Sequence, residues 1–162
     1  MRRALVLTIG LLLIAACGQT TTAAVQPYRV LVFTKTTGYR HTSIDEGAAA
    51  IRALGRDHGF RVDTTADTSR FIPSRLARYK AVVFLSTTGT PIVKPSERRA
   101  FEGYIRKGGG FVGIHAASDT RGKWAFYEGL VGARFAHHEP GTPSRTVTVE
   151  DSTSAATRGT VS

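Results

Sequence analysis

Four short apolar runs constrain the fold of this chain more than any other feature. The runs cover residues 29–34, 60–64, 81–85 and 111–114, and segments with helical patterns or Pro and Gly punctuation separate them. Strands that alternate with helices predict a parallel sheet with helices on both faces and right-handed crossovers. A length of 162 residues suits one such domain. The sequence therefore predicts an α/β fold.

The segments between the apolar runs carry helix signals. Ser43 and Glu46 match a capping box at the start of a helix that ends at Gly59. A short helix is predicted over 73–79, and Pro95 opens a third helix. Further along, the pattern predicts a helix over 123–131 and an edge-type strand over 144–149.

The N-terminus predicts a leader peptide. Arg2 and Arg3 precede an apolar stretch that is too short to span a membrane comfortably and ends in Leu-Ile-Ala-Ala-Cys at Cys17. This pattern resembles the lipobox of bacterial lipoproteins, which implies cleavage before Cys17 and a lipid on its sulfur. Residues 18–27 then form a tether. We expect an extracytoplasmic, membrane-anchored lipoprotein, or a secreted protein if Cys17 carries no lipid.

The charge distribution argues against a nucleic-acid partner. Lys and Arg number 22 against 12 Asp and Glu, which gives a formal net charge of +10. The basic residues are scattered, and no tight basic block interleaves with aromatic residues. An Arg-rich, solvated surface accounts for the excess.

Two histidines follow predicted strands and form the candidate site. His41 lies in the loop after the first run, and His115 follows the fourth run directly. If the sheet had the strand order 3-2-1-4, these strands would be neighbours and both imidazoles would border one crevice at their carboxyl ends. We predict catalytic roles for His115 and His41 as acid and base, with Asp119 orienting His115.

Further polar and aromatic residues are candidates for substrate binding. A crevice with hydroxyl groups and a cation suits a polyhydroxylated or anionic small molecule. A divalent metal held by His41, His115 and His138 is an alternative, although the sequence has no local ligand spacing and requires no cofactor. Trp124 has two candidate roles, packing in the core, which we prefer, and a sugar-stacking platform. The predicted substrate-binding residues are Thr37, Tyr39, Arg40, Trp124 and His138.

The two histidine-containing motifs resemble a known family. Residues 33–44 (Phe-Thr-Lys-Thr-Thr-Gly-Tyr-Arg-His-Thr-Ser-Ile), 109–117 (Gly-Gly-Phe-Val-Gly-Ile-His-Ala-Ala) and 124–135 resemble the ThuA-like trehalose-utilisation family. The resemblance covers 28–162 and implies a flavodoxin-like, class I glutamine amidotransferase-like three-layer fold with a mostly parallel sheet. His115 stands where amidotransferases have a nucleophilic cysteine, so amidotransferase activity is not expected.

The resemblance implies a role in carbohydrate utilisation. The family is associated with trehalose-like and keto-disaccharides, and its members are described as glycosyl hydrolase-like. Two departures stand out: His137-His138-Glu139-Pro140 replaces a single histidine before proline, and Ser154-Ala155 replaces a His-Pro pair. The last strand and a Gly-rich segment of the family are not in this sequence, so we expect a C-terminally incomplete domain. A non-catalytic carbohydrate-binding module and an inactive fragment are the alternatives.

Overall fold

A four-stranded parallel β-sheet forms the centre of the structure, a computed structural model that describes residues 27–120, 122–141 and 143–159. The strands are β1 (Arg29–Phe33), β2 (Arg61–Thr65), β3 (Ala81–Leu85) and β4 (Gly110–Ile114). Their order is β2-β1-β3-β4, and every neighbouring pair is parallel. The carboxyl ends of all four strands therefore lie at the same end of the sheet.

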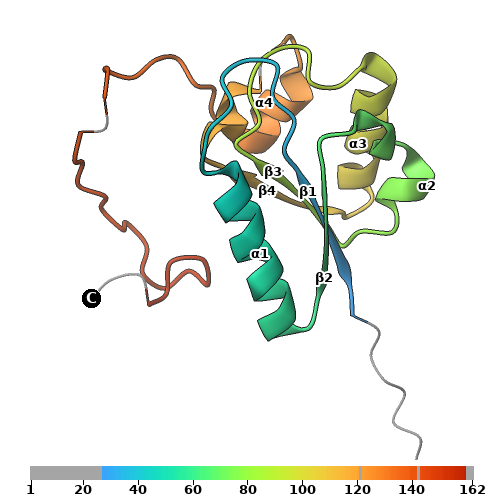
Figure 1. Ribbon diagram of the computed structural model, residues 1–162, viewed down its shortest axis with the longest axis horizontal. Helices are drawn as coiled ribbons and strands as arrows, with labels where there is room; N and C mark the ends of the chain where they lie inside the picture. Colours follow the sequence, from blue (N-terminus) through green and yellow to red (C-terminus); the bar gives the residue numbers. More distant parts are fainter. Residues whose placement is uncertain (1–26, 121, 142, 160–162) are drawn as a thin grey trace, which may run out of the picture.

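Helices cover both faces of this sheet. One face packs against α1 (Ile44–His58), and the other packs against α2 (Pro73–Leu76), α3 (Pro95–Arg106) and α4 (Ala125–Val131), as Figure 1 shows. The chain winds outward in both directions from β1 and β3, which is the flavodoxin-like strand order. The predicted three-layer α/β fold is confirmed.

The predicted strand order 3-2-1-4 is wrong, because β3 lies between β1 and β4. Residues 82–85 of β3 are buried, as expected for a strand with helices packed on both faces. By contrast, β2 reads Arg-Val-Asp-Thr-Thr and has no fully buried residue, which suits an edge. At the other edge, β4 leaves Val112 47% exposed on the face of the sheet that α1 covers.

The core consists of two apolar clusters, one on each face of the sheet. The cluster under α2, α3 and α4 is rich in aromatic side chains, and the ring of Phe84 lies 5.4 Å from that of Phe101. The cluster under α1 is smaller and aliphatic, and it includes Val32, Ala48 and Leu85. Burial of both clusters holds the strands, and thereby the loops at their carboxyl ends, in fixed positions.

Two local predictions are wrong. Ser43 occupies the N-cap of α1, but its own backbone is helical and its side chain makes no capping hydrogen bond. The capping contact occurs instead at α3, where the backbone N–H of Lys94 donates to Glu97 Oε2 at 2.6 Å. Residues 144–149 form no strand; this exposed segment runs outside the layered part of the molecule (Figure 1).

The predicted leader, residues 1–17, and residues 18–26 of the predicted tether lie outside the described residues. Among the helices that the structure describes, none has both the length and the apolar character needed to cross a membrane.

Candidate functional site

The candidate site lies at the carboxyl ends of β1, β3 and β4. Loops extend the strands there through two parallel bridges, Thr36 with Thr88 and Gly89 with Thr120. The backbone N–H of Thr37 donates to the carbonyl of Thr88 at 2.9 Å, and Thr88 Oγ1 donates to the carbonyl of Tyr39 at 2.6 Å. The loop after β3 thus fastens the loop after β1, which carries Tyr39 toward the site.

The two predicted histidines meet in space. The ring centroids of His41 and His115 are 4.4 Å apart at an angle of 72°. The ring of Tyr39 packs edge-on against His41 at 4.9 Å. Their strands are not neighbours, but a 3-10 helix, η2 (His115–Asp119), packs over the end of β3 and brings His115 across.

His115 has an unusual backbone conformation. Its φ is +51°, in the left-handed region that residues with a Cβ rarely adopt. Ser86, directly after β3, also has a positive φ of +48° and is buried. Sharp turns therefore follow the carboxyl ends of two neighbouring strands, β3 and β4. Strained backbone of this kind concentrates at functional sites, where surrounding structure fixes it.

A cavity of about 800 Å³ opens at the carboxyl ends of the strands. Its size falls in the range of sites that bind small molecules. Apolar and polar side chains both contribute to the walls, and an exposed cation, Arg145, pairs there with Glu139. The cavity is lined by Tyr39, His41, Thr88, His115, Ala116, Ser118, Asp119, Phe135, His138, Glu139, Gly141, Pro143 and Arg145.

The electrostatics of the site act mainly on His41. Burial lowers the pKa of His41, and the positive charges of His115 and His138 lower it further. The negative charge of Asp119 opposes this effect and raises the pKa. The neutral form of His41 is therefore favoured, as a general base requires. The predicted role of Asp119 in orienting His115 stays a prediction.

Three predicted substrate-binding residues lie away from the cavity wall. Thr37 supports the loop through its backbone, and Arg40 pairs with Asp45 at 3.2 Å on the surface. Trp124 is only 5% exposed, stacks on Tyr127 at 5.0 Å, and donates from Nε1 to Glu102 at 2.7 Å. Trp124 thus packs in the core, and the structure brings together Tyr39, His41, His115, Asp119 and His138.

Sequence reasoning missed several lining residues. Thr88 belongs to the polar loop after β3, and its position at a strand end was the available signal. Phe135 and Arg145 come from the irregular segment after α4, where no periodic pattern indicated which side chains turn toward the site. His138 lines the cavity, while its Nδ1 lies 2.7 Å from the carbonyl of Glu139.

The alternative of a three-histidine metal centre can be tested against this geometry. Within the described residues, no three His, Cys, Asp or Glu side chains are arranged to hold a metal ion.

Comparison with known proteins decides the family. The family model described as trehalose utilisation, ThuA, matches residues 29–162. The chain belongs to the ThuA family. A solved structure of a ThuA-like protein from Bacteroides uniformis ATCC 8492 is similar, with 27% sequence identity and a TM-score of 0.54. The match covers 71% of this chain and 48% of that one, so this chain spans about half of its length.

No curated protein matches the sequence. Membership in the ThuA family relates the chain to trehalose utilisation, and the resemblance noted from the two histidine motifs is confirmed.

Proposed function

We propose that this ThuA-family protein is an enzyme of carbohydrate utilisation that transfers protons between His41, His115 and a bound sugar. The 4.4 Å separation of the two imidazole rings at the wall of a cavity carries this proposal. Imidazoles titrate near neutral pH, so a pair of them can supply an acid and a base together.

The electrostatic environment of the two rings suggests which histidine is the base and which is the acid. Burial lowers the pKa of His41 most, and the nearby charge of His115 lowers it further. Because the environment disfavours the charged form of His41, His41 is the base and His115 the acid. The rings of His41 and His115 are close enough to exchange protons with adjacent atoms on the same face of a substrate.

The proposed reaction is proton transfer at a carbonyl sugar, because an imidazole acid and an imidazole base would meet at one wall of the cavity. In a keto-sugar, His41 would remove the proton from the carbon next to the carbonyl while His115 protonates the carbonyl oxygen. The enediol so formed then takes the proton of His41 at the former carbonyl carbon and gives the proton of its other hydroxyl group to His115, which yields the rearranged sugar and restores both histidines. Tyr39 and Phe135 border the cavity and would stack on the apolar face of the sugar ring.

Turnover assays with keto-disaccharides and with trehalose test the proposal. His115→Asn is the sharpest variant, because asparagine tolerates a positive φ while lacking a titratable group. We expect this variant and His41→Gln to lose turnover, and His58→Asn, at the exposed end of α1, to keep it. Unchanged turnover in His115→Asn would reject the assignment.

A carbohydrate-binding module without catalysis is the second candidate. Tyr39 is 69% exposed at the cavity, as in surfaces that bind sugars by stacking. Calorimetric titration that shows sugar binding, together with chromatography that shows no product, would favour this candidate.

The proposed location is extracytoplasmic, with the chain anchored to a membrane through a lipid on Cys17. Support comes from the lipobox-like sequence before Cys17. Incorporation of labelled palmitate into the wild-type chain, and its loss in Cys17→Ser, is the expected result.

A further inference from the structure

The amino end of the sheet, at which all four strands begin, gathers residues that are far apart in the sequence. Backbone hydrogen bonds join the strand starts: the N–H of Arg61 donates to the carbonyl of Tyr28 at 2.8 Å, and the N–H of Lys80 donates to the carbonyl of Arg29 at 2.8 Å. Because α1, α2 and α3 lead into β2, β3 and β4, these helices also end there, as Figure 1 shows for α1 and β2.

Exposed cations collect at this amino end. They are Arg56, Arg61, Arg78, Lys80, Arg106 and Lys107. The acidic side chains there are Asp57 and Asp63, and Asp63 already pairs with Arg29. Within the part of the chain that the structure describes, the exposed cations of this end take part in no ion pair. Positive charge is therefore in excess at the amino end.

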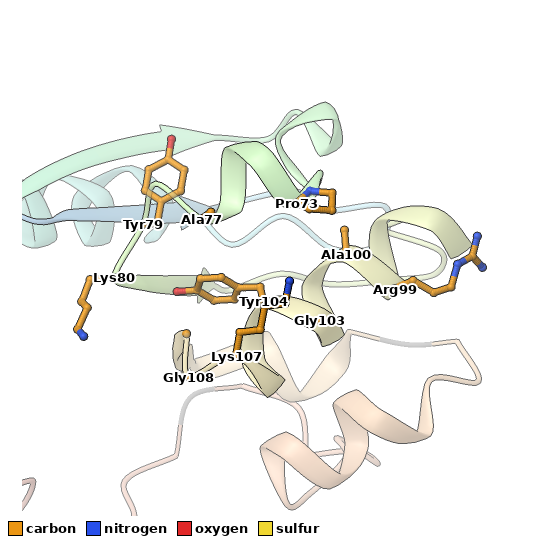
Figure 2. Close-up of a pocket in the computed structure, with 11 residues that line it drawn as sticks. Pro73, Ala77, Tyr79, Lys80, Arg99, Ala100, Gly103, Tyr104, Lys107 and Gly108 are labelled. Atoms are coloured by element: carbon orange, nitrogen blue, oxygen red, sulfur yellow. The ribbon is translucent and has the colours of Figure 1, made fainter.

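Helix dipoles account for some of these cations but not for all of them. Arg56 and Arg106 lie in the last turns of α1 and α3, where the partial negative charge of a helix end favours a cation. Arg61 and Lys80 lie outside the last turn of any helix, at the starts of β2 and β3. Figure 2, a close-up of the hollow between α2 and α3, shows Lys80 pointing away from the sheet. Its charge thus faces a partner from outside the molecule.

Exposed apolar groups accompany the cations. Tyr28 is 50% exposed and stacks on Phe60 with the ring centroids 5.3 Å apart. Leu54, near the end of α1, is 49% exposed. Apolar and aromatic side chains beside cations are typical of protein surfaces that lie on lipid headgroups. Tyr28 is also the residue at which the predicted tether, residues 18–27, joins the domain.

We propose that the amino end of this domain binds the surface of a membrane that contains anionic phospholipids. The cations contact lipid phosphates, and Tyr28 and Phe60 pack at the level of the headgroups. The tether favours a membrane over other polyanions, because a lipid on Cys17 would bring the chain to a bilayer. The choice of partner therefore rests on the proposed location, whereas the charged and aromatic surface rests on the geometry.

Sedimentation with lipid vesicles tests the proposal on a chain that begins at Gly18, to which neither the leader nor a lipid contributes. This chain keeps the whole sheet and both core clusters. We expect binding to vesicles of equal parts phosphatidylcholine and phosphatidylglycerol, weaker binding at high salt, and none to phosphatidylcholine alone. The triple variant Arg61→Gln, Arg78→Gln and Lys80→Gln should lower the partition coefficient by at least about tenfold.

The matched control removes three exposed cations that lie away from the amino end. Lys94→Gln, Arg99→Gln and Lys123→Gln, toward the starts of α3 and α4, should together leave binding nearly unchanged. Tyr28→Ser should weaken binding severalfold, while Tyr39→Ser, at the histidine cavity and 69% exposed, should not. Circular dichroism verifies that each variant folds.

Equal losses in the two triple variants would overturn the proposal, because they would show an effect of net charge alone. Binding to a DNA duplex without binding to the anionic vesicles would overturn it as well. Vesicle binding by the chain that begins at Gly18 is measured separately from palmitate incorporation at Cys17, so the membrane-binding surface and the lipid anchor can fail independently.

Discussion

The positive φ of His115 leads to a prediction about stability. A side chain with a Cβ in the left-handed region costs roughly 1–2 kcal/mol, because the Cβ approaches the carbonyl oxygen of the same residue. At φ +51°, His115 bears this cost in the folded protein. A residue without a Cβ would not.

Two variants separate this strain from the loss of the imidazole. His115→Ala and His115→Gly both remove the ring, but only His115→Ala keeps the Cβ. Glycine regains roughly 1–2 kcal/mol of strain and loses about 0.5–1 kcal/mol to the greater freedom of the unfolded chain. We therefore expect His115→Gly to be more stable than His115→Ala by about 1 kcal/mol, or about 3 °C in Tm.

Urea unfolding of the full chain, followed by circular dichroism, measures this difference. The slope with denaturant should be the same for both variants, since the same surface is exposed. Arg52, in the interior of α1, provides the control with the opposite sign: Arg52→Gly should be less stable than Arg52→Ala by about 1 kcal/mol. If His115→Gly is no more stable than His115→Ala, the backbone at this site is not strained and the reasoning fails.

Three further predictions follow from the same structure. Thr88→Val removes the hydroxyl that holds the carbonyl of Tyr39, so we expect a loss of about 1–2 kcal/mol in denaturant unfolding and lower turnover; wild-type stability would contradict this. Phe101→Ala empties the centre of the aromatic cluster and should cost about 3–5 kcal/mol, measured as a fall in the urea midpoint. Burial lowers the pKa of His41, so the folded state binds protons less readily than the unfolded chain, and stability should fall as pH drops below about 6.5. His41→Gln should flatten that dependence in unfolding measured at pH 7.5 and 5.5; an unchanged slope would contradict it.

The layered fold could be predicted because its signals are local. The apolar residues of β1 and β3 and the opening Pro95 of α3 each specify an element through their own neighbours. Strand order is different, because it depends on which strands tolerate an edge. The polar composition of β2 contained that information, but comparison of all four strands was needed to use it.

The two histidines of the site could be predicted from the sequence, but several of the other residues that line the cavity could not. His41 and His115 follow strands, and parallel strands present all such residues at one edge. Trp124 shows the limit of composition, since an aromatic residue in a core helix and one on a sugar platform have the same sequence signal. Phe135 and Arg145 come from a segment without secondary structure, whose path depends on tertiary contacts.

The most direct measurement of the shared histidine site is an NMR titration of the imidazoles. In the full chain, we expect His41 to titrate below its usual pKa of 6.5, because burial and the charge of His115 both disfavour its protonated form. In His115→Ala, the pKa of His41 should move up toward 6.5. A pKa of His41 that is the same in wild type and His115→Ala would contradict the proposal that the two rings act as a pair.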